Sequence, residues 1–243
     1  MKSIAEDTSF KFFPQLNKVE DKGWFNSSAR FRPSYFEQYF QEDSLQNKLL
    51  KEIAYNYLLP IKEILESFEY FARIRRKVKA EVMCDLCCGH GFVGLLFAIF
   101  ERGVNTVYLV DRTEPESRQK LIESCKKVAP WIENKIINIE DKISPESDWL
   151  QQGMSVISTH ACGVLTDLTL DIAISVKGKV AVLPCCYPEK KCAAPKALQS
   201  RLGFETAFDI ERTYKLEHAG YHVNWGSIPS SITPMNRVII GTL

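Results

Sequence analysis

The sequence lacks any long uninterrupted apolar run, although 45% of its 243 residues are hydrophobic. Its longest central apolar tract, residues 92–100, is shorter than the roughly 20 residues that a membrane-spanning helix needs. The first residues, MKSIAEDTSFKFFPQ, contain neither an apolar core nor a small-residue cleavage site, so we expect no signal peptide. We therefore expect a soluble, cytoplasmic protein with no membrane partner.

An excess of either charge is also lacking, because 31 Lys and Arg residues balance 30 Asp and Glu residues and leave a net charge of +1. A near-neutral total gives no general reason to expect a polyanionic partner, although a local basic patch can still bind RNA. No internal repeat or low-complexity tract is present. The length fits one α/β domain with an extension, or at most two small domains.

The eight cysteines do not form a secretory pattern. In a small secreted domain this number would suggest a disulfide framework, but this chain is long and most of its cysteines fall in or beside expected buried strands. We therefore expect free thiols in a reducing compartment. The cysteines are Cys84, Cys87, Cys88, Cys125, Cys162, Cys185, Cys186 and Cys192.

The hydrophobic pattern changes near residue 80. Upstream, apolar residues recur at helical spacing over residues 34–77, with an interruption at Pro60. Downstream, short apolar strands alternate with helical segments, which indicates a parallel sheet covered on both faces. The expected strands are 81–85, 106–111, 135–139, 154–159 and 179–184. The expected helices between them lie near 93–101, 115–128, 165–174 and 193–202.

Two strand-like runs, 221–228 and 237–243, end the chain and are separated by a short proline-containing loop. Such a hairpin-like finish adds an antiparallel strand to a parallel sheet. We predict an α/β fold, a Rossmann-like seven-stranded mixed sheet that is mostly parallel with an antiparallel last strand. Residues 80–243 would form this domain, and residues 1–79 an N-terminal helical extension that serves as a lid or substrate surface.

A glycine-containing turn, Asp85-Leu-Cys-Cys-Gly89-His-Gly91, joins the first expected strand to a helix. Glycines at such a turn let the backbone approach a ligand, and the helix N-terminus favours negative charge. Asp111 ends the second strand, where a carboxylate can bind both ribose hydroxyls, and Asp141 follows the third strand. Together these features predict a site for a nucleotide-type cofactor.

The turn resembles motif I of class I methyltransferases, in which an acidic residue precedes three alternating glycines. Asp85 matches the acid and Gly89 and Gly91 match the last two glycines, whereas Cys87 stands in place of the first. The resemblance implies S-adenosylmethionine as cofactor, with Asp141, or Glu140 beside it, at the adenine amino group. The implied cofactor-binding residues are Asp85, Cys87, Gly89, Gly91, Asp111, Asp141 and His160.

Two other functions stay open on this fold: an NAD(P)-dependent oxidoreductase and a non-catalytic scaffold that only binds the cofactor. A dehydrogenase would need glycine where Phe92 stands, and Asp111 would repel the 2′-phosphate that Arg112 suits. No Asp/Asn-Pro-Pro-aromatic motif follows the fourth strand. Methylation of an exocyclic amino group is therefore disfavoured.

The segments after the fourth and fifth strands should border the site of methyl transfer, because ligands collect at the carboxyl ends of strands. The run HACGVLTDLTL, which begins at His160, resembles that of eukaryotic tRNA acceptor-stem 2′-O-methyltransferases. The pair Cys185-Cys186 also occurs in that family. The resemblance covers residues 80–243 and implies an RNA acceptor, although this chain lacks the family's Cys/His zinc modules.

Three residues are candidates for catalysis: His160, Asp167 and Cys185. Imidazole titrates near neutral pH, so His160 would orient or deprotonate an acceptor hydroxyl, or else only hydrogen-bond to backbone. Asp167 is a second base or, as we favour, an N-terminal residue of the following helix that interacts with its dipole. The sequence does not set the oligomeric state.

Cys185 and Cys186 leave three interpretations open. They could attack a pyrimidine ring covalently, bind a metal with Cys192 and a histidine, or pack around the cleft. Their spacing fits no standard zinc motif, so no metal site is predicted and packing is favoured.

Two segments are candidates for binding RNA. Aromatic and basic residues alternate over residues 24–32, and a basic run occupies residues 73–79. Such side chains can stack on bases and pair with phosphates. The simpler interpretation of the basic run is a solvated helix end.

Overall fold

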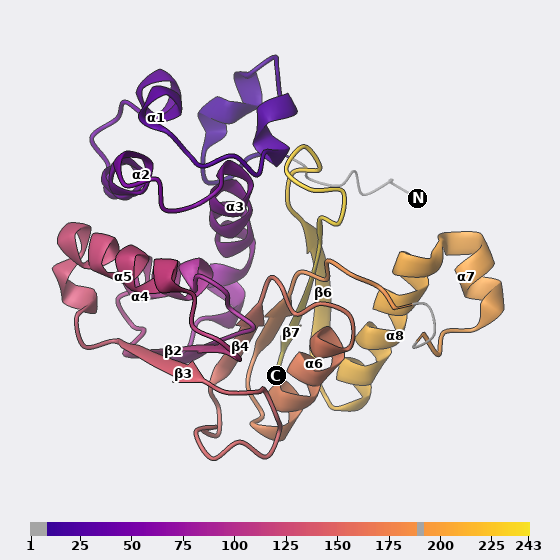
Figure 1. Cartoon of the computed structure of the whole chain (residues 1–243). Coiled ribbons are helices and arrows are strands. Elements are labelled where there is room, and N and C mark those ends of the chain that lie inside the picture. The colour runs from indigo at the N-terminus through magenta and orange to yellow at the C-terminus, as the bar shows by residue number, and fades with distance from the viewer. Residues whose placement is uncertain (1–8, 189–191) are drawn as a thin grey trace.

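The computed structural model describes residues 9–188 and 192–243 (Figure 1). The first eight residues of the expected N-terminal extension lie outside this part of the chain. A central sheet carries helices on both faces, and the extension lies over one end of it (Figure 1). Within the described residues, no helix has both the length and the apolar character needed to cross a membrane.

The sheet has seven strands in the order β3-β2-β1-β4-β5-β7-β6. Strands β1 to β5 pair in parallel, and β7 runs antiparallel to both β5 and β6. This confirms the predicted Rossmann-like mixed sheet. The strands are β1 Val82–Leu86, β2 Thr106–Asp111, β3 Ile136–Glu140, β4 Ser155–Ser158, β5 Val180–Val182, β6 His222–Ser227 and β7 Arg237–Thr242. The strand order reverses between β1 and β4, where a ligand crevice is expected.

The helical stretch expected over residues 34–77 consists of three helices, with a loop after Tyr39 and a break before Pro60. Helix α8 was not expected, because its buried face carries Asp209 and Arg212 and so lacks a continuous apolar stripe. The helices are α1 Pro33–Tyr39, α2 Leu45–Tyr55, α3 Ile61–Val78, α4 Phe92–Phe100, α5 Glu116–Val128, α6 Val164–Ser175, α7 Lys196–Leu202 and α8 Phe204–His218.

The core lies in two layers, one on each face of the sheet. Alternate residues of a strand point to opposite faces, so Val107 joins the cluster under α3 and α4 while its neighbour Tyr108 joins the cluster under α6. In the neighbouring strand β1, the four consecutive residues from Met83 to Leu86 are all buried, so both faces of this strand are covered. Burial on both faces explains why the central strands read as continuous apolar runs.

Helix α3 joins the N-terminal extension to the sheet. The buried Phe68 packs edge-on against Phe13, at 4.8 Å between ring centroids, and against Phe92 of α4, at 5.4 Å. The buried Glu69 accepts hydrogen bonds from the backbone amides of Lys11 and Phe12 at 2.9 and 2.8 Å. The extension and one face of the sheet thus share a single hydrophobic core. The division at residue 79 stays a prediction.

Several side chains of the two candidate RNA-binding segments form contacts within the fold. The side chain of Arg73 is 4% exposed, forms an ion pair with Glu69, and donates a hydrogen bond to the carbonyl of Ser227 at 2.6 Å. Arg75 forms an ion pair with Glu101, with 2.6 Å between its Nε and Oε1 of the glutamate. Upstream, Phe25 and Phe31 are buried, and Trp24 stacks on Tyr35 and Tyr39 with ring centroids 5.1 Å apart in both pairs. These side chains therefore stabilise the fold.

We expect Phe68→Ala to lower the free energy of unfolding by about 3–5 kcal/mol, because it removes the ring that links the extension to α4. Leu202→Ala is the control, since Leu202 is 47% exposed and its loss should cost less than about 0.5 kcal/mol. Urea unfolding followed by tryptophan fluorescence and circular dichroism should give one coincident transition. Two separate transitions would show that the extension folds as an independent domain.

Candidate functional site

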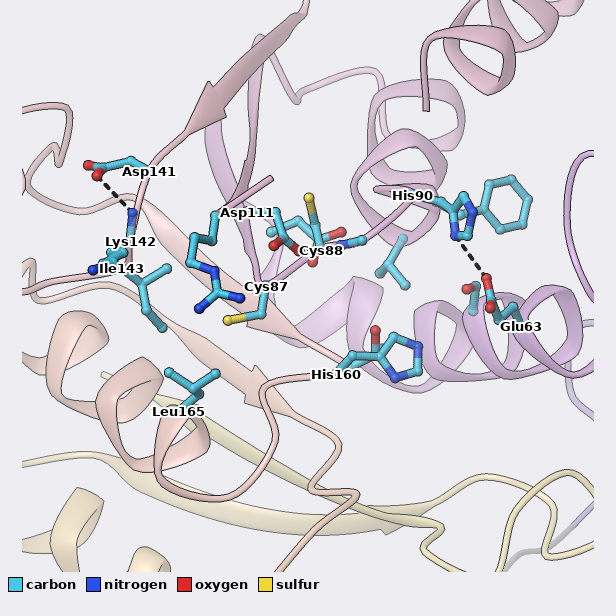
Figure 2. A pocket seen from close by; sticks show the side chains of 17 residues that line it. Glu63, Cys87, Cys88, His90, Asp111, Asp141, Lys142, Ile143, His160 and Leu165 are labelled. Carbon is cyan, nitrogen blue, oxygen red and sulfur yellow. Dashed lines mark hydrogen bonds and ion pairs between the residues drawn. The ribbon is translucent and has the colours of Figure 1, made fainter. Parts of the chain in front are cut away.

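A cavity of about 730 Å³ opens at the carboxyl ends of β1 to β4 (Figure 2). Its volume lies within the roughly 300–1,000 Å³ typical of small-molecule sites. Helix α3 forms one wall, and the segments that follow the four strands form the rest. The lining residues are Glu63, Ser67, Asp85, Cys87, Cys88, Gly89, His90, Phe92, Val93, Asp111, Arg112, Asp141, Lys142, Ile143, Thr159, His160 and Leu165.

The turn between β1 and α4 forms the floor of the cavity. Cys87, Gly89 and Gly91 all have positive φ angles, of 52°, 53° and 73°. Cys87 therefore adopts the left-handed conformation that glycine adopts most easily, which explains why motif I carries glycine there. A Cβ atom added to Gly89 would meet no atom within 4 Å, whereas one added to Gly91 would lie 2.7 Å from Leu109. The Gly89 backbone is thus left open to a ligand.

The Gly89 peptide is held from both sides. Its N–H donates to the carboxylate of Asp111 at 2.8 Å. Its carbonyl accepts two hydrogen bonds from Arg118, a fully buried residue of α5, at 2.8 and 2.6 Å. Arg118 could not be identified from the sequence, because an arginine within an amphipathic helix has no local feature that marks it as buried.

Asp85 lies at the end of β1 and is 2% exposed. One carboxylate oxygen, Oδ2, accepts a hydrogen bond from the Gly94 amide at 2.9 Å, while the buried Oδ1 has no hydrogen-bond partner among the described residues. Burial raises the pKa of Asp85 to about 7, although the Gly94 amide and the charge of Arg118 act to lower it. A cationic ligand group beside Oδ1 would satisfy this oxygen.

The two further acidic positions lie on successive segments of the cavity wall. Asp111 ends β2, and Asp141 follows β3 and accepts a hydrogen bond from the Trp149 indole at 3.2 Å. Asp141 lines the cavity, whereas Glu140 is not among its lining residues. The structure thus favours Asp141 of the two alternatives.

Helix α3 brings two carboxylates to two histidines at the cavity. Glu63 Oε2 lies 3.0 Å from Nδ1 of His90, and Glu66 Oε1 lies 3.4 Å from Nε2 of His160. Burial raises the pKa of Glu66. Burial acts in the same direction on Glu63, but the hydrogen bond and charge of His90 outweigh it and lower that pKa. Neither glutamate could be identified from the sequence, since only the three-dimensional packing places α3 at this wall.

Asp167 is held away from the cavity by an ion pair. Its two carboxylate oxygens accept from Arg212 of α8 at 2.9 and 3.2 Å, and Arg212 also pairs with the buried Asp209 at 3.2 Å. Asp167 is not among the residues that line the cavity. The geometry therefore favours a structural role for Asp167 over a role as a base.

All eight cysteines are free thiols, as expected. Cys87 lines the cavity, while Cys185 lies beside Cys162, with 3.1 Å between the sulfur atoms. Burial and the neighbouring thiols raise the pKa of Cys185. A protonated thiol is a weak nucleophile, which disfavours the covalent mechanism for this residue.

A family model described as a methyltransferase domain matches residues 55–192. This match covers more than half of the chain and includes the glycine turn, the ends of β2 and β3, and the segment around His160. The chain belongs to this methyltransferase domain family. The membership confirms the predicted class of enzyme domain and S-adenosylmethionine as its methyl donor, and it sets the oxidoreductase alternative aside.

Two curated relatives of this methyltransferase domain carry the name "glutathione S-transferase C-terminal domain-containing protein". The one from Xenopus laevis is 24% identical over 198 residues, which cover 67% of this chain and 31% of that protein. The one from Homo sapiens is 24% identical over 207 residues, which cover 65% of this chain and 29% of that protein. The chain thus spans about three tenths of the length of the curated relatives that it matches.

Solved structures of methyltransferases are less similar in sequence to this chain than the curated relatives are. An O-methyltransferase family protein from Burkholderia thailandensis is 13% identical, with a TM-score of 0.44, and the match covers 94% of this chain and 67% of that one. The tRNA (uracil-54, C5)-methyltransferase of Pyrococcus abyssi, solved with S-adenosyl-L-homocysteine, is 13% identical, with a TM-score of 0.43, and the match covers 76% and 39%. The family match, rather than these similarities, therefore establishes the class.

The polar groups that line the cavity of the methyltransferase domain suit the polar groups of S-adenosylmethionine. The unpartnered Oδ1 of Asp85 suits the ammonium of the methionine part, and the exposed Gly89 backbone leaves room for a ligand. Asp111 offers carboxylate oxygens for the ribose hydroxyls. These residues would hold the donor along the ends of β1 and β2.

We expect the affinity for S-adenosylmethionine to fall as the pH drops below about 7, by up to tenfold per pH unit. The reason is that Asp85, with its pKa of about 7, becomes protonated and can no longer pair with an ammonium. The ligand's own amino group stays charged in this range, because α-amino groups titrate near pH 8. Calorimetric titrations at a series of pH values would measure this dependence.

The isosteric variant Asp85→Asn is the matched control for the pH experiment. It should bind the donor weakly at every pH and show a flat profile, because the titrating carboxyl is gone. A wild-type affinity that does not change between about pH 6 and pH 8 would contradict the role given to Asp85.

Proposed function

We propose that this chain is an active methyltransferase in which Asp85, Gly89, Asp111 and Asp141 hold S-adenosylmethionine and His160 receives the acceptor's proton. The observation that carries the proposal is the order of these residues around one cavity. The groups proposed to bind the donor lie at or directly after the ends of β1, β2 and β3, and His160 follows β4. Donor and acceptor would therefore meet near the strand-order reversal between β1 and β4.

The donor would lie across the carboxyl ends of three neighbouring strands. Asp85 would pair with its ammonium, Asp111 with its ribose hydroxyls and Asp141 with its adenine amino group. When bound, S-adenosylmethionine supplies a methyl group that its positive sulfur makes electrophilic. Methyl transfer depends chiefly on alignment of the reacting atoms, so fixing the donor along the wall of the cavity is the main task of these residues.

His160 is placed to accept a proton from an acceptor hydroxyl. Its side chain is 45% exposed, and its Nε2 faces the buried carboxyl of Glu66 at 3.4 Å. Its Nδ1 is then the atom available to the acceptor. Glu66 would fix the ring orientation and stabilise the imidazolium that forms, which makes Glu66 a positioning residue.

The acceptor that we propose is a ribose 2′-hydroxyl of RNA. The resemblance of the segment that begins at His160 to tRNA 2′-O-methyltransferases supports this acceptor, as does the absence of the motif for amino-group methylation. In the basic run over residues 73–79, Arg73 and Arg75 are engaged within the fold while Arg76 and Lys77 are exposed, so we do not base the acceptor on this run. We propose the cytoplasm as the compartment, which agrees with eight free thiols.

We expect His160→Ala to lower the rate of methyl transfer by about 100-fold or more, the usual contribution of general acid–base catalysis. Donor affinity should change little, because the variant leaves the aspartates of the donor site in place. Single-turnover assays with a radiolabelled methyl donor would measure the rate, and calorimetry the affinity. His222→Ala, on the exposed end of β6, is the matched control and should keep wild-type activity.

Glu66→Gln tests the positioning role separately. It should lower kcat by about tenfold with little effect on KM and should shift the pH–rate profile, because the histidine loses its anionic partner. An unchanged rate in His160→Ala would remove this pair from the chemistry.

The acceptor class is tested by incubating the protein with labelled donor and, in parallel, with an RNA fraction, protein extract and small metabolites. Digestion of the RNA followed by mass spectrometry should yield 2′-O-methylated nucleosides. Label in protein or metabolites alone would contradict the RNA acceptor, and donor binding without any transfer would indicate a non-catalytic scaffold.

A further inference from the structure

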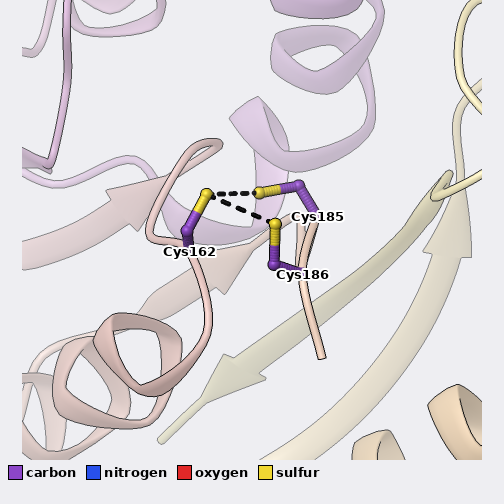
Figure 3. Close-up of side chains that lie close together, drawn as sticks. All are labelled: Cys162, Cys185 and Cys186. Atoms are coloured by element: carbon purple, nitrogen blue, oxygen red, sulfur yellow. Dashed lines mark hydrogen bonds between the residues drawn. The ribbon is translucent and has the colours of Figure 1, made fainter. Parts of the chain in front are cut away.

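Three cysteine sulfurs converge at the carboxyl ends of β4 and β5 (Figure 3). Cys162 comes from the loop before α6, whereas Cys185 and Cys186 come from the segment after β5. The Cys162 sulfur lies 3.1 Å from that of Cys185 and 3.6 Å from that of Cys186. All three lie within 4.8 Å of one another. Two segments far apart in sequence thus present one group of thiols.

Packing of small apolar side chains does not explain this group. Free cysteine is among the most buried residue types, and Cys84, Cys88 and Cys125 follow that rule here. By contrast, Cys162 and Cys186 are exposed. Among the described residues, the polar contacts of these three sulfurs are with one another.

We propose that Cys162, Cys185 and Cys186 bind one zinc ion. Three thiolates are a ligand set that zinc prefers, and Zn–S bonds of about 2.3 Å in a tetrahedral site place sulfurs about 3.8 Å apart. The observed distances of 3.1 and 3.6 Å are both shorter than that value, and no two of the three sulfurs lie more than 4.8 Å apart. Side-chain rotations that move the sulfurs by less than about 1 Å would bring these two pairs to that spacing.

Zinc binding at this group would be coupled to the loss of thiol protons. A divalent ion would displace these protons and neutralise the thiolates, which makes its affinity fall as the pH falls. The spacing rules applied to the sequence could not detect this site, because its ligands come from two loops.

Three protein ligands leave the fourth position of a tetrahedral ion open, as in catalytic rather than structural zinc sites. The ion would also join the β4–α6 loop to the segment after β5. Cys162 lies two residues after His160, which lines the cavity. Zinc would therefore fix the loop that carries His160, whether or not the acceptor is RNA.

The test is the zinc content and zinc affinity of the full chain, purified under reducing conditions. We expect one equivalent of zinc by elemental mass spectrometry. Each of Cys162→Ala, Cys185→Ala and Cys186→Ala should lower the affinity by about 100-fold or more in competition with a chromophoric chelator, since loss of a ligand exceeds the 10–100-fold effect of an outer partner. Zinc should also protect these three thiols from alkylation.

Cys192→Ala is the matched control, because Cys192 lies further along the same segment and outside the group of three. It should bind zinc as the wild type does. Circular dichroism and donor titration would show that each variant is folded, and they separate this result from the proposed function. A reduced wild-type protein that binds no zinc, or equal zinc loss in Cys192→Ala, would overturn the assignment.

Discussion

The hydrogen bonds of the Gly89 backbone hold the floor of the cavity in place. Asp111 accepts from its amide and Arg118 donates twice to its carbonyl, so β1, β2 and α5 are locked together at one residue. Arg118 is fully buried, and its positive charge lies among the acidic groups Asp85 and Asp111. A buried charge needs such partners, and the glycine turn supplies one of them through its carbonyl. The same contacts leave the other face of the turn open to a ligand.

The N-terminal extension contributes more than a cover over this site. Its long helix α3 packs against α4 through Phe68 and Phe71, while Glu63 and Glu66 lie beside the histidines of two cavity loops. One helix therefore serves both the core and the cavity. The family match also includes this helix, because it begins at residue 55, before the first strand.

Local patterns predicted the parallel strands, the hairpin finish, the glycine turn and the acidic residue after each strand, because these features depend on neighbouring residues. Contacts between distant segments were not predictable in the same way. Helix α8 was missed because the pair Asp209 and Arg212 interrupts its apolar face. Glu66 and Arg118 gave no local sign of their partners, and Cys162 meets Cys185 only once β4 and β5 lie side by side. The roles of the predicted site residues stay predictions.

The most direct test of the account is calorimetric titration of the full chain with S-adenosylmethionine and S-adenosylhomocysteine, with NADPH as the control ligand. We expect saturable binding of both sulfur nucleotides, no binding of NADPH, and a large loss of affinity in Asp111→Ala. Binding of NADPH alone, or of none of the three ligands by a folded protein, would contradict it.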